Sequence, residues 1–175
     1  SAGFFCMWAV YFVVTGFVDV YSGFVMWVTQ WDTQEFCDSP FLSTGPRDFW
    51  SRRWNLLFRN VTHTCVFTPL NKLGIPPLYG VAMVFIVSCL VHEYMVLVSS
   101  HSSQWLGWMS AFFIVHALAT VVNTYVSRNR TWTKLVKDVP NAVWVAIHLV
   151  WIGITSPLFF TPALKCIPIL DYTLF

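Results

Sequence analysis

A histidine followed directly by a glutamate lies inside one of the most apolar stretches of the chain. His92 and Glu93 interrupt residues 81–98, a run long enough to be a membrane-spanning helix. An ionisable side chain at that depth costs about 3 kcal/mol on insertion scales and is usually retained for function. Imidazole is the side chain whose charge changes most easily near neutral pH. His92 is therefore a candidate general base or proton carrier. The alternative is a purely structural contact to a neighbouring backbone or to Ser88.

The glutamate beside the histidine favours the functional interpretation. Neighbouring residues on a helix point about 100° apart, so His92 and Glu93 cannot easily both avoid lipid. We therefore expect protein or water around much of this helix. The zinc-protease pattern HExxH is absent, because the run reads His92-Glu93-Tyr94-Met95-Val96. No metal site is predicted.

Three more ionisable side chains fall in apolar runs. His116 and His148 each stand alone in such a run, and we interpret them as interhelical hydrogen-bonding residues. Asp19 lies in the first apolar run and is a candidate partner for one of these histidines.

The second group of chemically useful residues is the motif Asp48-Phe49-Trp50-Ser51-Arg52-Arg53-Trp54-Asn55. Helical spacing over residues 47–61 places apolar side chains on one face: Trp50, Trp54, Leu57, Phe58, Val61 and Cys65. Arg52, Arg59 and His63 fall on the opposite side. The pattern predicts an amphipathic helix lying in the membrane interface. It does not explain an asparagine between the two faces, or so dense a tryptophan pattern.

The composition indicates an all-α, polytopic membrane protein. Hydrophobic residues make up 57% of the 175 residues and charged residues only 10%, against about 25% charged residues in soluble domains. The net charge of +2 is too small to suggest nucleic acid binding. The five cysteines show no CxxC pairing, so neither a disulfide framework nor a zinc site is expected.

Four spans are predicted, at about residues 3–28, 77–98, 105–126 and 142–160. Nine of the ten basic residues fall in the segments between spans one and two and between spans three and four. An alternating path places both segments on one side, which the positive-inside rule makes the cytosol. Both ends of the chain then face the lumen, and His92 lies past the membrane midplane towards the lumen.

These two groups of residues together resemble the membrane-bound O-acyltransferase family. The motif from Asp48 to Asn55 is followed, 37 residues after Asn55, by His92 on an apolar helix bearing Ser88-x-x-x-His92-Glu93. The arginine pair is closest to the wax synthase branch, which acylates long-chain alcohols. His92-Glu93-Tyr94 leans towards the sterol and diacylglycerol acyltransferases. The strongest similarity covers residues 38–97.

The resemblance implies roles for individual residues. His92 would act as the general base on an acceptor alcohol, with Asn55 as its polar partner. Substrate-binding residues would be Trp50, Arg52, Arg53, Trp54 and Glu93. The acyl donor would be acyl-CoA, a co-substrate, and no cofactor is implied. Arginines near the motif are candidates to attract the CoA phosphates or lipid headgroups.

The chain is short for this family, whose members have around eight or more spans. We expect a single membrane domain, 1–175, that forms the C-terminal portion of a longer transferase, in the endoplasmic reticulum membrane. The partners implied are acyl-CoA, a lipid alcohol and membrane lipid. Sterol or diacylglycerol O-acyltransferase activity and a catalytically incomplete membrane fragment remain the alternatives. The sequence does not specify an oligomeric state.

Overall fold

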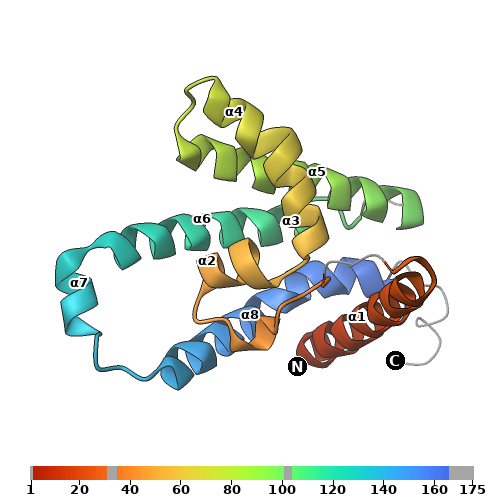
Figure 1. The fold of residues 1–175 in the computed structure, drawn as a ribbon, viewed down its shortest axis with the longest axis horizontal. Helices are drawn as coiled ribbons and strands as arrows, with labels where there is room; N and C mark the ends of the chain where they lie inside the picture. Colours follow the sequence, from red (N-terminus) through yellow and green to blue (C-terminus); the bar gives the residue numbers. More distant parts are fainter. Residues whose placement is uncertain (1, 31–34, 101–103, 166–175) are drawn as a thin grey trace.

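Four helices are long and apolar enough to cross a membrane by length and composition. The computed structural model describes residues 2–30, 35–100 and 104–165, and these residues form helices and no strand. The four long helices are α1 (Ala2–Thr29), α5 (Pro77–Ser100), α6 (Trp108–Arg128) and α8 (Asn141–Lys165) (Figure 1). The predicted all-α fold with four spans is confirmed.

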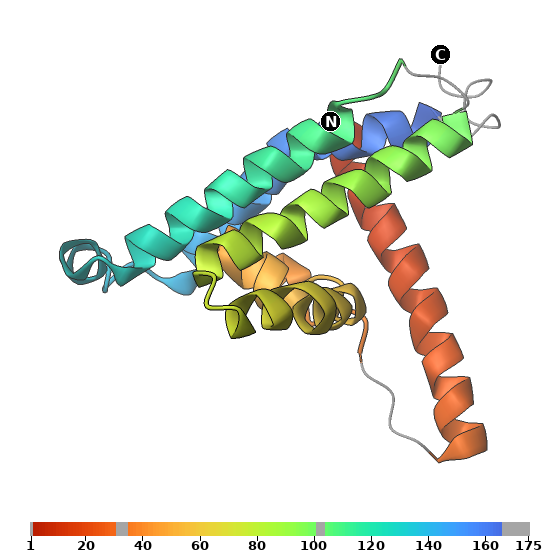
Figure 2. The ribbon, with the colours of Figure 1, turned by 90° about the horizontal axis from the view of Figure 1, so that it is seen from above.

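Helices α5, α6 and α8 lie side by side and run in alternating directions (Figure 2). The short helix α7 (Arg130–Leu135) lies at the same end of this layer as the start of α5. The second basic segment and the end of the first therefore lie at one end of this layer, as the predicted topology requires for α5, α6 and α8, whereas α1 ends away from it. Helix α1 packs against α8 and then diverges from the layer.

Between α1 and α5, the described residues form six short helical pieces. They are η1 (Pro40–Leu42), α2 (Pro46–Asp48), the π-helix η2 (Phe49–Arg53), α3 (Leu56–Thr62), the π-helix η3 (His63–Phe67) and α4 (Thr68–Lys72). Helix α2 and η2 lie between α6 and α8 (Figure 1). The motif thus enters the core of the layer instead of lying along its surface.

The prediction of one continuous amphipathic helix over residues 47–61 is wrong. Trp54 is extended (φ −99°, ψ 130°) and Asn55 is left-handed (φ 44°, ψ 63°), so the helix breaks between η2 and α3. The cause is pairing with a distant segment. The Leu56 amide donates to the Phe36 carbonyl, and the Asp38 amide donates to the Arg53 carbonyl, each at 2.8 Å.

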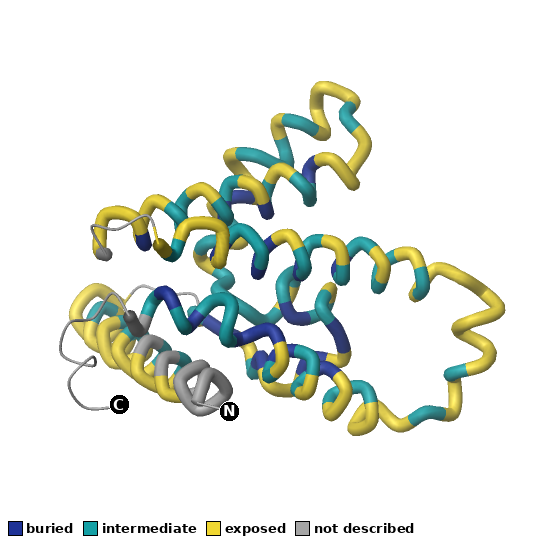
Figure 3. Tube along the Cα trace, turned by 180° about the vertical axis from the view of Figure 1, so that it is seen from behind, coloured by how far each residue is buried: buried dark blue, intermediate teal, exposed yellow. Residues whose placement is uncertain are grey.

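Because of this break, the apolar residues predicted to share one helix face lie in different surroundings. Trp50 packs on a core cluster of Phe85, Phe112 and Phe113. Leu57 and Val61, beyond the break, remain exposed. Buried residues concentrate where η2, α6 and α8 face one another, whereas the side chains of α1 whose burial is described are largely exposed (Figure 3).

Helix α8 contains two prolines, Pro157 and Pro162. Pro157 has no N–H to donate to the carbonyl of Gly153, and a free carbonyl is costly in lipid. The hydroxyl of Ser156 donates to that carbonyl at 3.1 Å. The Ser-Pro pair therefore allows α8 to continue through the proline without an unpaired acceptor at Gly153.

Candidate active site

His92 presents one anchored and one free ring nitrogen. Its Nδ1 lies 2.7 Å from the backbone carbonyl of Ser88, one turn earlier on α5. A carbonyl can only accept, so Nδ1 carries the proton and a neutral ring keeps its lone pair on Nε2. Nε2 makes no hydrogen bond within the described residues. The alternative to a catalytic role for His92 is a structural contact to a neighbouring backbone or to Ser88. That contact is present, but it does not occupy Nε2, the nitrogen that could accept a proton.

Aromatic side chains from two other spans hold the His92 ring. Its centroid lies 4.7 Å from that of Phe113 on α6 and 5.3 Å from that of Phe159 on α8. Three predicted spans therefore meet at this histidine. The expectation of protein or water around much of the His92 helix is met by protein on this side only, because Leu90, Tyr94 and Met95 of α5 are exposed.

Glu93 faces the beginning of α6. Its Oε1 accepts hydrogen bonds from the Gly107 amide (3.0 Å), the Ser110 amide (2.7 Å) and the Ser110 hydroxyl (2.8 Å). Its Oε2 is buried and has no partner within the described residues. The carboxylate thus joins α5 to α6, directly beside the candidate base.

Trp50 is joined to His116 in a chain of buried hydrogen bonds. The indole Nε1 donates to Nδ1 of His116 at 3.1 Å, which makes Nδ1 an acceptor and leaves the proton of the neutral ring on Nε2. That Nε2 lies 2.9 Å from Oγ1 of Thr155, whose own hydroxyl faces the Trp151 carbonyl at 3.0 Å. The chain joins η2, α6 and α8, and the predicted interhelical role of His116 is confirmed.

His148 and Asp19 do not form the contacts predicted for them. His148 is buried against Phe49, with ring centroids 5.6 Å apart, and neither ring nitrogen has a partner within the described residues. Asp19 is exposed on α1. The partners of His116 are Trp50 and Thr155 instead.

Asn55 begins helix α3 in a left-handed backbone conformation. Its Oδ1 accepts from the Phe58 amide at 3.0 Å, and its own amide donates to Sγ of Cys37 at 3.4 Å. Asparagine tolerates this backbone region and is a preferred N-cap. The side-chain NH2 makes no hydrogen bond with the described residues. Within the described residues, no hydrogen bond joins Asn55 to His92.

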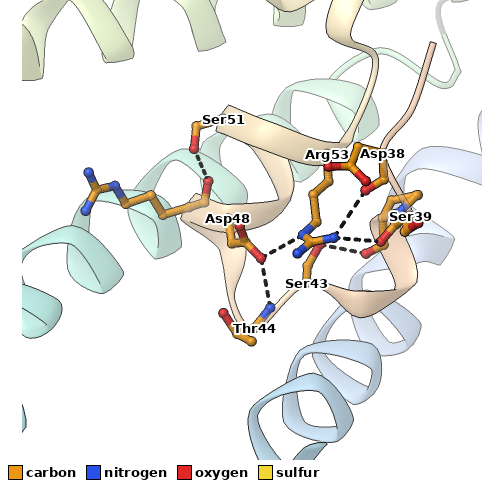
Figure 4. Close-up of polar contacts among 9 residues, drawn as sticks. Asp38, Ser39, Ser43, Thr44, Asp48, Ser51 and Arg53 are labelled. Carbon is orange, nitrogen blue, oxygen red and sulfur yellow. Dashed lines mark hydrogen bonds and ion pairs between the residues drawn. The ribbon is translucent and has the colours of Figure 1, made fainter. Parts of the chain in front are cut away.

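The two arginines of the motif have different surroundings. Nε of Arg53 forms an ion pair with Asp48 at 2.9 Å. The guanidinium also reaches the carbonyls of Asp38 and Ser39, at 3.3 and 3.4 Å (Figure 4). Arg52 is exposed. Arg53 therefore fixes the loop before η2, and Arg52 is the arginine of the pair that remains available to a ligand.

The second tryptophan of the motif packs within the protein. The Trp54 ring stacks on Phe49, with centroids 5.3 Å apart and planes 16° apart, and it also contacts Tyr11 of α1. Trp54 thus links the motif to α1, whereas Trp50 links it to α6 and, through Phe113, to the surroundings of His92.

Comparison with known proteins finds the motif and His92 within one matched segment. Residues 31–115, which include the motif and His92, match the model of the membrane bound O-acyl transferase family. The matched segment, just under half of the chain, is similar to that family. No solved structure gives a significant match to the chain.

Curated relatives carry names that agree with the family match. The chain is 26% identical over 144 residues to a probable long-chain-alcohol O-fatty-acyltransferase 3 of Arabidopsis thaliana, covering 77% of this chain and 41% of the relative. The probable long-chain-alcohol O-fatty-acyltransferase 2 of Arabidopsis thaliana is 29% identical, and the aligned region covers 37% of that relative. Diacylglycerol O-acyltransferase 1 of Dictyostelium discoideum is 28% identical over 70% of this chain and 19% of its own length. The chain spans less than half the length of each of these relatives.

Several residues at the site were not found from the sequence. Phe113, Phe159, Ser110 and Thr155 provide the contacts that hold the histidines and Glu93. A signal exists for one of them, because Thr155 begins a Thr-Ser-Pro run inside an apolar helix, where hydroxyls commonly satisfy backbone carbonyls. The others are ordinary residues of a span and carry no sequence signal.

Proposed function

We propose that this protein is an O-acyltransferase that moves a fatty acyl group from acyl-CoA to a long-chain lipid alcohol. The observation that carries the proposal is His92, whose Nδ1 is tied to a carbonyl while Nε2 has no hydrogen-bond partner among the residues that the structure describes. It lies on an apolar helix within the segment matched by the acyltransferase family. Names of relatives support the acceptor class, since several plant relatives are called long-chain-alcohol O-fatty-acyltransferases.

The proposed reaction follows from the chemistry of an alcohol and a thioester. Nε2 of His92 takes the hydroxyl proton as the oxygen attacks the thioester carbonyl, because an un-ionised alcohol is a poor nucleophile. The tetrahedral oxyanion then collapses and the carbon–sulfur bond breaks. The CoA thiolate leaves and receives the proton held by the imidazolium. The products are an ester and free CoA, and the histidine returns to its neutral form.

Asn55 is proposed to assist this reaction. Its side-chain NH2, which has no hydrogen-bond partner among the described residues, supports that role. An amide N–H donor can stabilise a developing oxyanion in a site that excludes water. The exposed Arg52 is proposed to attract the CoA phosphates, for which a guanidinium is well suited. The proposed location is the endoplasmic reticulum membrane, where acyl-CoA and lipid alcohols would be the substrates.

A second acceptor class is supported by the match to a diacylglycerol O-acyltransferase. Diacylglycerol, or a sterol, presents a hydroxyl that the same base would activate. The rival from outside the enzyme class is a catalytically incomplete membrane fragment, in which His92 serves packing alone.

The test uses the intact protein in microsomes supplied with labelled acyl-CoA and one acceptor at a time. We expect wax ester from a long-chain alcohol, and loss of product by at least about a hundredfold in His92→Ala. The matched control is His63→Ala, an exposed histidine outside the spans. Triacylglycerol or steryl ester as the main product would assign the other acceptor class. Normal transfer by a folded His92→Ala variant would refute the catalytic role.

A further inference from the structure

The first turn of α6 is capped by a side chain from another helix. Gly107, the residue before α6, has φ +92° and no side chain to cap the helix. The first N–H groups of a helix have no partner inside it, and in a membrane each such group is costly. Oε1 of Glu93 accepts two of them, the amides of Gly107 and Ser110.

The position of the carboxylate is electrostatically favourable. The N-terminus of a helix carries a partial positive charge, which stabilises an acidic group placed there. The Ser110 hydroxyl adds a third donor to the same oxygen, at 2.8 Å. The thiol of Cys89, one turn before Glu93 on α5, donates to Oγ of Ser110 at 3.0 Å. Two residues of α5 therefore meet at Ser110.

This junction lies one turn away from the contact that holds His92. Ser110 is three residues before Phe113, and Phe113 packs on the imidazole with centroids 4.7 Å apart. Glu93 is the next residue after His92. Fixing Ser110 against Glu93 therefore also sets the position of Phe113 along His92.

We propose that Glu93 is a positioning residue that clamps the start of α6 to α5 and so holds Phe113 against the His92 ring. This inference rests on the proposed function, because it assigns Glu93 a part in keeping the base in place. It differs from substrate binding by Glu93, since Oε1 already receives three donors and Oε2 is buried.

Glu93→Gln and Glu93→Ala separate positioning from direct chemistry. Glutamine keeps a carbonyl oxygen that can accept from the α6 amides, whereas alanine removes the cap. We expect Glu93→Gln to retain acyl transfer within about tenfold, because neutral hydrogen bonds replace charge-assisted ones. Glu93→Ala should lose about a hundredfold in kcat, since a displacement near 1 Å can have that effect. Equal loss in both variants, with folding intact, would overturn the proposal.

Ser110→Ala provides an independent test that leaves the backbone caps in place. It removes one of the three bonds to Oε1 and the partner of Cys89. We expect a fall in kcat that is smaller than that of Glu93→Ala and not additive with it, because both act on one junction. The KM for the acceptor should change little. Additive losses, or an effect confined to the KM, would overturn the positioning role. The Ser110→Ala variant still tests the positioning role if Glu93→Ala does not fold.

The same assays separate this inference from the proposed function. If the unaltered protein forms no ester with any acceptor, the proposed function fails. If His92→Ala is fully active, the proposed catalytic role of His92 fails, whatever the Glu93 variants do. If His92→Ala is inactive and Glu93→Gln is as inactive as Glu93→Ala, the proposed function stands and only the positioning role fails.

Discussion

The motif around residues 48–55 and the surroundings of His92 use their polar groups in opposite ways. In the motif, the Trp50 indole donates to His116 and the Arg53 guanidinium pairs with Asp48. The Asn55 carbonyl oxygen caps α3. At His92, one nitrogen is anchored and the other has no hydrogen-bond partner in the part of the chain that the structure describes. The contrast shows that a motif dense in functional residue types can serve mainly to build the fold, while the proposed reactive atom lies on a plain apolar helix.

The largest expected effects come from the two histidines of these regions, His92 and His116. His92→Ala should lose at least about a hundredfold in activity and little stability, because it removes one side-chain hydrogen bond. His116→Ala should lose about 3 kcal/mol of stability, because it leaves Trp50 and Thr155 unpaired in a buried site. Acyl transfer per folded molecule and thermal denaturation in detergent measure the two losses. A His116→Ala variant that is stably folded but inactive would contradict the assignment of His116 to the fold and of His92 to the chemistry.

Asn55 can be tested through its backbone as well as its side chain. Glycine accepts the left-handed conformation, so Asn55→Gly should cost only a few tenths of a kcal/mol for the lost cap. Asn55→Ala should cost about 1–2 kcal/mol, because it also strains the backbone. If the amide stabilises the oxyanion as proposed, both variants lose about a hundredfold in kcat. A fully active Asn55→Gly would make the residue purely structural.

Trp50→Phe tests the buried hydrogen-bond chain alone. The ring remains but the donor to His116 is lost, so stability should fall by about 1–2 kcal/mol. The matched control is Trp54→Phe, whose indole N–H makes no hydrogen bond with the described residues. Thermal denaturation of both variants gives the comparison, and equal shifts would show that packing, not the hydrogen bond, matters at Trp50.

The arginine pair offers a smaller contrast within the motif itself. Arg53→Ala should destabilise the protein by about 1–2 kcal/mol, because it breaks the pair with Asp48 and two contacts to carbonyls. Arg52→Ala should change stability by less than about 0.5 kcal/mol, as expected for an exposed site. It should instead raise the KM for acyl-CoA. An unchanged KM in Arg52→Ala would remove the proposed contact with CoA.

The last prediction changes no residue and concerns the labelling of two native cysteines outside the spans. Cys65 is exposed, whereas burial raises the pKa of the Cys37 thiol and so lowers its reactive thiolate fraction near neutral pH. A membrane-impermeant maleimide added to sealed microsomes at pH 7 should label Cys65 and spare Cys37. Protection of Cys65 until the membranes are opened would overturn the predicted cytosolic side.

The four spans could be predicted because their signal is local. A long apolar run specifies a spanning helix whatever lies around it. The break at Asn55 could not be predicted in this way. It depends on backbone hydrogen bonds with Phe36 and Asp38, which lie outside the segment with helical periodicity. The preference of asparagine for left-handed and N-cap positions was the available signal.

The candidate site was predictable only in part for the same reason. A histidine within an apolar run is costly to place in a membrane, so its presence alone indicates function, and His92 could be singled out. Its orientation depends on Ser88 one turn earlier, and its packing depends on Phe113 and Phe159, which look like any other aromatic residues of a span. The link from Trp50 to His116 joins residues 66 positions apart.

The bond between Glu93 and the start of α6 has a consequence for the order in which the protein is made. During synthesis α5 emerges before its hydrogen-bond donors at Gly107 and Ser110 exist. An acidic residue in an isolated span opposes insertion by about 3 kcal/mol. The penalty is offset only once α6 arrives, so α5 and α6 should enter the bilayer as one hairpin. Glycosylation-site mapping should show poor insertion of α5 alone and efficient insertion of the pair; equal insertion of both would contradict this order.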